Sequence, residues 1–135
     1  MKVAIRYYTR SGNTKKLADA IAEAVGVEAK DVSVPLEEPV DILLLGSSVY
    51  AAGVDDAVKQ FIADNHAKIG TLYNFSTAAL ISSTYKQIQK LAGEQGVKVA
   101  AEEFHCRGSF AMMHRGRPNQ EDLNAAAVFA KRVCG

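Results

Sequence analysis

The chain has 135 residues, of which 48% are hydrophobic, and its 16 basic and 15 acidic residues give a formal net charge of +1. This length suits one domain over residues 1–135, and the near-neutral charge argues against nucleic acid or an anionic membrane surface as an obligatory partner. The apolar runs are much shorter than the ~20 residues of a membrane span and the N-terminus does not resemble a signal peptide, so we expect a cytoplasmic protein that is not in a membrane.

The first predicted element is a strand over 2–8, which leads through a polar loop into an amphipathic helix over 14–25. The loop consists of Thr9, Arg10, Ser11, Gly12, Asn13 and Thr14. A strand–loop–helix junction directs free backbone N–H groups and the positive end of a helix dipole at one point, which suits a phosphate. The loop therefore predicts a phosphate site.

A simpler interpretation of this loop is that Ser11 or Asn13 only caps the helix and Gly12 eases the turn. Four polar side chains crowd into one turn where a single cap would suffice, and this favours the phosphate site. Neither G-x-G-x-x-G nor G-x-x-x-x-G-K-[ST] occurs, which argues against dinucleotides and nucleoside triphosphates as ligands.

The next predicted strands cover 27–33 and 40–46, and the second of them begins with a nearly continuous apolar run. Such a run is typical of a strand buried on both faces of a sheet. The connection over 34–39 has two prolines and is too short for a full crossover helix. Extended, it still reaches roughly 20 Å, enough to pass over one intervening strand.

A loop of small residues is predicted over 46–53, followed by a helix over 55–66. A flat ring can approach such a backbone, and Tyr50 can stack on it; the alternative is that Tyr50 packs in the core. Gly53 is the residue of this loop that tolerates a positive φ. The loop therefore predicts a planar aromatic ligand.

The second half of the chain is predicted to contain strands over 73–79 and 97–105 and helices over 83–93 and 119–133. The small, uncharged residues over 76–83 form a third loop of the same kind. Cys106 and Cys134 are too few for a disulfide framework or a zinc site. His105 precedes Cys106 in a strand, so their side chains point to opposite faces, and we predict no nucleophile or metal site there.

Alternating strands and helices predict an α/β fold with a mostly parallel sheet, for which the order 2-1-3-4-5 is possible. In such a sheet the ligand lies beyond the carboxyl ends of the strands, where the order switches between the first and the third. The three loops at this edge suggest a planar heteroaromatic ligand with a phosphate tail.

The run over 9–14, Thr-Arg-Ser-Gly-Asn-Thr, resembles the T-x-[ST]-G-N-T phosphate loop of flavodoxins. Ser-Ser-Val-Tyr-Ala-Ala-Gly over 47–53 resembles the flavodoxin loop that flanks the isoalloxazine ring, and Cys-Arg-Gly over 106–108 is similar to the C-terminal part of short-chain members. The resemblance covers essentially the whole chain. It implies a flavodoxin-like three-layer sandwich with five parallel strands in the order 2-1-3-4-5, noncovalently bound FMN, and electron transfer between protein redox partners.

The resemblance also assigns cofactor-binding residues. Thr9, Arg10, Ser11, Gly12, Asn13 and Thr14 would hold the phosphate, Ser48, Val49, Tyr50, Ala51, Ala52 and Gly53 would flank the ring, and Thr77, Ala78 and Ala79 would contact its pyrimidine side. We expect a monomer with no metal and no catalytic residues of its own.

Two other functions stay open at the level of the sequence. The first is an FMN-dependent oxidoreductase of the quinone or protoporphyrinogen type, with Met112, Met113 and His114 lining a substrate pocket. The second is a flavin-free interaction domain. The chain also departs from typical flavodoxins, which are strongly acidic and have an aspartate-rich loop with a tyrosine after the fourth strand.

Overall fold

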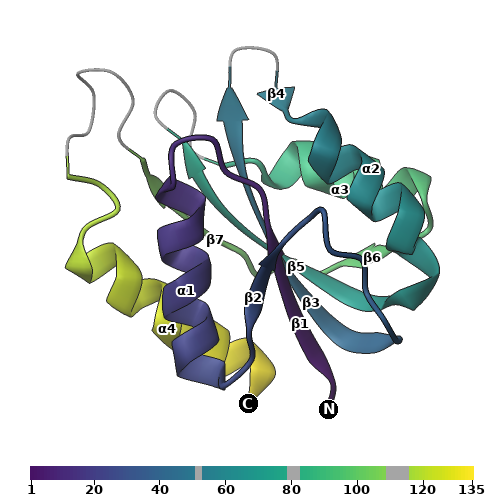
Figure 1. The fold of residues 1–135 in the computed structure, drawn as a ribbon, viewed down its shortest axis with the longest axis horizontal. Helices are drawn as coiled ribbons and strands as arrows, with labels where there is room; N and C mark the ends of the chain where they lie inside the picture. Colours follow the sequence, from purple (N-terminus) through teal and green to yellow (C-terminus); the bar gives the residue numbers. More distant parts are fainter. Residues whose placement is uncertain (51–52, 79–82, 109–115) are drawn as a thin grey trace.

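Strands and helices alternate along the chain in the computed structural model, which describes residues 1–50, 53–78, 83–108 and 116–135 (Figure 1). Of Val49 and Tyr50 it describes the backbone alone. The strands are β1 (Val3–Tyr7), β2 (Ala29–Asp31), β3 (Val40–Tyr50), β4 (Gly53–Val54), β5 (Ile69–Ala78), β6 (Lys98–Val99) and β7 (Phe104–Arg107). The helices are α1 (Asn13–Val25), α2 (Asp56–Asn65), the short 3-10 helix η1 (His66–Lys68), α3 (Tyr85–Glu94) and α4 (Gln120–Cys134).

The strands form one sheet in the order β2-β1-β3-β5-β6, in which β7 also pairs with β5. All of these pairs are parallel, and only the pairing of β4 with the end of β3 is antiparallel. Because β6 and β7 together occupy the place of the fifth strand, the predicted order 2-1-3-4-5 is confirmed.

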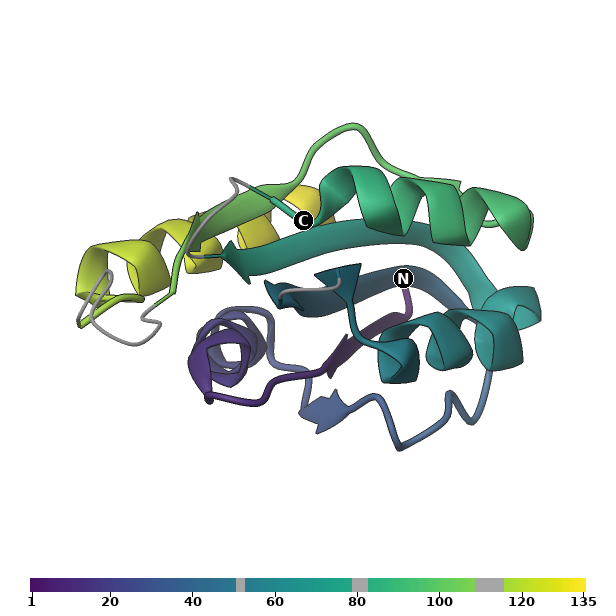
Figure 2. The ribbon, with the colours of Figure 1, turned by 90° about the horizontal axis from the view of Figure 1, so that it is seen from above.

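Helices cover both faces of the sheet, as the alternation of strands and helices predicts. Figures 1 and 2 show α1 and α4 on one face and α2 and α3 on the other. The two hydrophobic cores share β3, where Leu43 and Leu45 pack toward α2 and α3 and Leu44 packs toward α1 and α4. All three leucines are fully buried, which is why this strand is apolar at consecutive positions.

The predicted strand over 97–105 is wrong in one respect, because it is split into β6 and β7. Between Leu72 and Phe75 the strand β5 advances three residues, whereas its neighbour advances five, from Val99 to Phe104. The extra residues lie at the edge of the sheet, where no further strand is paired in the described part of the chain. The hydroxyl of Tyr85 donates to the carbonyl of Ala100 at 3.0 Å and ties the bulge to α3.

The connection from β2 to β3 has no helix, as predicted (Figure 2). Side chains from other elements satisfy its backbone instead. The buried Arg6 guanidinium donates to the carbonyls of Val34 at 2.9 Å and Pro35 at 3.2 Å. The Asn65 side chain accepts from the backbone N–H of Leu36 at 2.9 Å. These bonds replace the internal hydrogen bonds that a crossover helix would make.

Asn65→Ala is expected to lower the free energy of unfolding by about 2 kcal/mol, because it leaves the buried N–H of Leu36 without an acceptor. Asn65 also donates to the carbonyl of Phe61 at 2.9 Å, so a second bond is lost. Urea unfolding followed by circular dichroism measures the change. The exposed Asn124 of α4 supplies the control, Asn124→Ala. Equal midpoints for the two variants would contradict the anchoring role of Asn65.

Candidate functional site at the carboxyl ends of the strands

The loop between β1 and α1 ends in a glycine that caps the helix. Gly12 is the N-cap, with φ +90°, and α1 begins at Asn13. The simpler interpretation, in which Ser11 or Asn13 is the cap, is therefore wrong. Gly12 N–H donates to Thr9 Oγ1 at 2.9 Å, and Asn13 N–H makes a long contact of 3.4 Å to Ser11 Oγ. A residue with a side chain at Gly12 would be strained by its positive φ.

A side chain of β5 holds the first turn of α1 in place. Asn13 and Thr14 are buried, whereas Arg10 and Ser11 are exposed. Thr14 Oγ1 shares a hydrogen bond of 3.0 Å with Thr77 Oγ1 of β5. The structure thus brings together two of the three predicted cofactor-binding segments.

Gly108, just after β7, packs against the same place and was not among the predicted site residues. A Cβ atom on Gly108 would lie 2.9 Å from Nδ2 of Asn13 and 3.1 Å from Cβ of Thr77. The Cys-Arg-Gly resemblance over 106–108 was the only signal of its importance.

The predicted loop over 46–53 is wrong, since β3 continues through its first half. Ser47 and Ser48 pair with Ser76 and Thr77 of β5, and β3 then folds back so that Tyr50 pairs with Gly53 of β4. Small residues are typical of loops, but here they occur in a strand, and at Gly46 the neighbouring side chains leave no room for a Cβ atom. Gly53 has φ +101°, a backbone conformation that glycine tolerates.

Gly46 shows this constraint most clearly. A Cβ atom there would lie 2.3 Å from Cε2 of Phe75 and 2.9 Å from Cγ2 of Thr14. Phe75 fills the space above Gly46 and is itself fully buried. The absence of a side chain at Gly46 therefore lets β3 pass beneath the phosphate loop.

Ser48 carries a buried hydroxyl without a hydrogen-bond partner among the residues that the structure describes. By the alternation of the strand, its side chain is on the same face as Leu44, which is the face that α1 covers. Ser48 pairs with Thr77, whose hydroxyl reaches the first turn of α1. A buried hydroxyl left unpaired costs about 1–3 kcal/mol, so this position suits a polar group of a bound ligand.

Asp55 is a neighbour of the phosphate loop that the sequence alone did not reveal. Its side chain caps α2 by accepting from Ala57 N–H at 2.9 Å, and it also accepts from Arg10 Nη2 at 2.7 Å. The hydrogen bond from the Ala57 backbone, followed by that from Arg10, lowers the pKa of Asp55 below its usual value. The carboxylate is therefore ionised at neutral pH.

Several predicted residues lie outside the part of the chain that the structure describes. These are Ala51, Ala52 and Ala79 of the cofactor set, and Met112, Met113 and His114 of the alternative substrate pocket. The stacking of Tyr50 on a ring also stays a prediction, as do contacts of the Val49 side chain. Ala78 is buried at the end of β5, next to Thr77.

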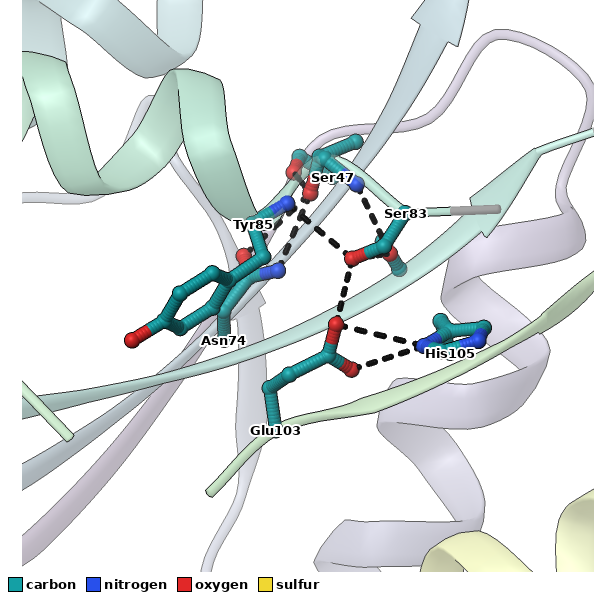
Figure 3. Close-up of polar contacts among 8 residues, drawn as sticks. Ser47, Asn74, Ser83, Tyr85, Glu103 and His105 are labelled. Carbon is teal, nitrogen blue, oxygen red and sulfur yellow. Dashed lines mark hydrogen bonds and ion pairs between the residues drawn. The ribbon is translucent and has the colours of Figure 1, made fainter. Parts of the chain in front are cut away.

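A polar network lies beneath the start of α3 (Figure 3). Thr84 Oγ1 accepts from Ser47 Oγ at 2.9 Å and from Asn74 Nδ2 at 3.1 Å. Nearby, Ser83 Oγ donates to Glu103 Oε1 at 2.5 Å, and His105 Nδ1 lies 2.9 Å from Glu103 Oε2.

A nucleophilic triad contains the residue types of Ser83, Glu103 and His105, but these side chains do not contact one another in the sequence that a triad requires. In a triad the imidazole contacts the serine and the carboxylate orients the imidazole. Here the carboxylate contacts both, and among the contacts of the described residues the His105 imidazole does not reach the serine to take its proton. The network instead anchors Ser83 to the sheet edge.

Cys106 and His105 point in different directions, as predicted. Cys106 packs against the core between the sheet and α4, whereas His105 is exposed and contacts Glu103. Burial raises the pKa of the Cys106 thiol to about 12, so it is protonated at neutral pH and weakly nucleophilic. Within the described ranges, no cluster of His, Cys, Asp and Glu side chains is suited to a metal ion, and no helix is long and apolar enough to span a membrane.

The chain belongs to the flavodoxin family. The family profile, described as a flavodoxin domain, matches residues 4–112. Membership implies flavin binding and a general role in electron transfer. No curated protein matches the chain.

Solved structures of flavodoxins share this fold. A flavodoxin from the domain Archaea has a TM-score of 0.80 at 18% identity, with 98% of this chain and 96% of that chain covered. Flavodoxin 1 from Bacillus cereus has a TM-score of 0.76 at 20% identity, with 99% and 97% covered. A flavodoxin, WrbA-like protein from Agrobacterium tumefaciens has a TM-score of 0.70 at 17% identity, with 97% and 93% covered.

Proposed function

We propose that this protein is a cytoplasmic, monomeric electron carrier that binds FMN and exchanges electrons with protein redox partners. The observation that carries the proposal is the Gly12-capped start of α1, which lies at the carboxyl end of β1 beside Thr77. This arrangement offers backbone N–H groups and a helix dipole to a phosphate. The buried hydroxyl of Ser48, which has no hydrogen-bond partner among the described residues, lies on the same face of the sheet and supports a ligand that reaches over β3.

The described residues fit FMN, and each has a separate task. Thr9, Ser11 and the backbone over 10–14 would hold the phosphate, and the buried Asn13 and Thr14 would keep the turn in place. Ser48 would donate or accept a hydrogen bond beneath the ligand. The β3–β4 hairpin and the backbone of Thr77 and Ala78 would border the ring.

The bound flavin would supply the redox chemistry, accepting and releasing electrons singly. The protein would hold it and exclude water from one face of the ring. The proposed phosphate donors are hydroxyl and backbone amide groups, because the Arg10 side chain of the same run is paired with Asp55. Because the chain has a formal net charge of only +1, local contacts would select its redox partners, rather than the field of a strongly acidic surface.

Purified protein is expected to be yellow, and the flavin-free form should bind FMN at least about tenfold more tightly than riboflavin. Charge-assisted hydrogen bonds to the phosphate supply this difference, and each contributes about 1.5–3 kcal/mol. Quenching of flavin fluorescence during titration measures both affinities. Equal affinities would refute the phosphate site, and the absence of flavin binding would refute the proposed function.

A second candidate is an FMN-dependent oxidoreductase of the quinone or protoporphyrinogen type. A pocket of about 340 Å³ between β7 and the start of α4 favours it. Phe104 and Cys106 line this pocket together with Arg107 and the ion pair of Arg117 with Asp122. Turnover of a quinone driven by NAD(P)H would distinguish such an enzyme from a carrier.

A further inference from the structure

The Arg10 side chain forms an ion pair with Asp55, the residue that caps the start of α2. Nη2 of Arg10 lies 2.7 Å from Oδ2 of Asp55, across 45 positions of the sequence. The Asp55 side chain is only 16% exposed, whereas that of Arg10 is 57% exposed. The largely buried Asp55 side chain is thus held in place, and the more exposed Arg10 side chain extends toward it.

Asp55 is held in place because its side chain also caps α2. Its Oδ1 accepts the N–H of Ala57 at 2.9 Å and so caps α2, while Oδ2 receives Arg10. A carboxylate that is held by a helix cap is a rigid point of attachment for the guanidinium.

The two ends of this contact belong to the two segments that border the proposed cofactor site. Arg10 lies in the phosphate loop over 9–14, two residues before Gly12. Asp55 follows β4, in which Gly53 pairs with Tyr50 of β3. The contact therefore joins the segment proposed for the phosphate to the segment proposed for the ring.

We propose that Arg10 and Asp55 are a positioning pair, which sets the distance between the phosphate loop and the β3–β4 hairpin and so aligns the site for both ends of the ligand. This inference rests on the proposed function. The competing role for Arg10 is a direct ligand of the phosphate. In that role the guanidinium would leave Asp55 or share its five N–H donors between the carboxylate and the phosphate.

The experiment compares Arg10→Gln, Asp55→Asn and the double variant by their affinities for FMN and riboflavin. Asn caps helices as well as Asp, so Asp55→Asn removes the charge and keeps the cap. Lys15→Gln and Asp19→Asn are matched controls, because this exposed pair of α1, with atoms 2.8 Å apart, changes the same charges near the same loop.

We expect each single variant to weaken riboflavin binding by the same factor, about two- to fivefold, as suits an ion pair near the surface. FMN binding should fall as well, and the double variant should be no weaker than either single one. Riboflavin has no phosphate, so its loss of affinity reports alignment alone. The Lys15 and Asp19 controls should leave riboflavin affinity unchanged.

Unchanged riboflavin affinity in both variants would overturn the proposal. The proposal would also be overturned if Arg10→Gln lowered the affinity for FMN but not for riboflavin while Asp55→Asn raised the affinity for FMN. This pattern would identify Arg10 as a phosphate ligand.

If the unmodified protein binds neither flavin, the proposed function has failed. The pair is then tested by amide hydrogen exchange of the flavin-free proteins over 9–14 and 53–57. Faster exchange in both variants supports the positioning pair, and exchange equal to that of the controls overturns it.

Discussion

Ser11→Ala is expected to weaken FMN binding by about ten- to hundredfold while riboflavin binding stays the same. The reason is that Ser11 is exposed and that, among the described residues, the contact of its hydroxyl is a long one of 3.4 Å from Asn13 N–H, so the hydroxyl is available to a phosphate. Loss of one charge-assisted hydrogen bond of about 1.5–3 kcal/mol corresponds to this factor. Fluorescence titration with the two flavins measures the affinities, and thermal unfolding should show an unchanged midpoint.

Thr14→Ala is the informative comparison, because its hydroxyl is buried and bonded to Thr77 Oγ1 at 3.0 Å. This variant should weaken FMN binding and also lower stability, since the Thr77 hydroxyl loses its buried partner. If Ser11→Ala reduced riboflavin affinity as much as FMN affinity, the Ser11 hydroxyl would be part of the loop structure and not of a phosphate site.

Gly46→Ala is expected to destabilise the fold by about 2–3 kcal/mol, a large share of the stability of a domain of this size. The added methyl group would lie 2.3 Å from the Phe75 ring, and Phe75 is fully buried in the core between the sheet and the helices α1 and α4. Either Phe75 or the backbone of β3 must move. The same methyl group would lie 2.9 Å from Cγ2 of Thr14, so FMN affinity should fall together with stability.

Gly93→Ala is the matched control for this prediction. Gly93 is an exposed residue within α3, and a Cβ atom there would meet nothing within 4 Å. An alanine in an open helical position should stabilise the protein by about 0.5–1 kcal/mol. Denaturant unfolding of both variants provides the comparison. A Gly46→Ala variant as stable as Gly93→Ala would show that β3 does not pass as closely beneath the loop as the structure indicates.

Much of the fold could be predicted from local patterns. The consecutive apolar residues over 40–45 predicted a strand buried on both faces, and Leu43, Leu44 and Leu45 are fully buried on alternating faces. Two prolines in the connection over 34–39 predicted the missing crossover helix. These features depend on residues close together in the chain, so the sequence carries them directly.

The errors have a shared cause in contacts between distant parts of the chain. The segment over 46–50 has the composition of a loop, yet it forms a strand because β5 pairs with it and Phe75 occupies the space above Gly46. The strand predicted over 97–105 is split because its register against β5 shifts between Val99 and Phe104. Strand register depends on which neighbours are present, and composition alone does not encode it.

The sequence by itself determined the strand–loop–helix junction at 9–14, the alternation of elements and the resemblance to flavodoxins, because a glycine, a hydroxyl or a helical period acts over a few residues. Only the tertiary structure decided that Arg10 contacts Asp55, that Thr14 contacts Thr77 and that Ser48 is buried with no hydrogen-bond partner in the part of the chain that the structure describes. Each of these depends on where parallel strands end relative to one another, and the packing of the whole sheet sets those positions.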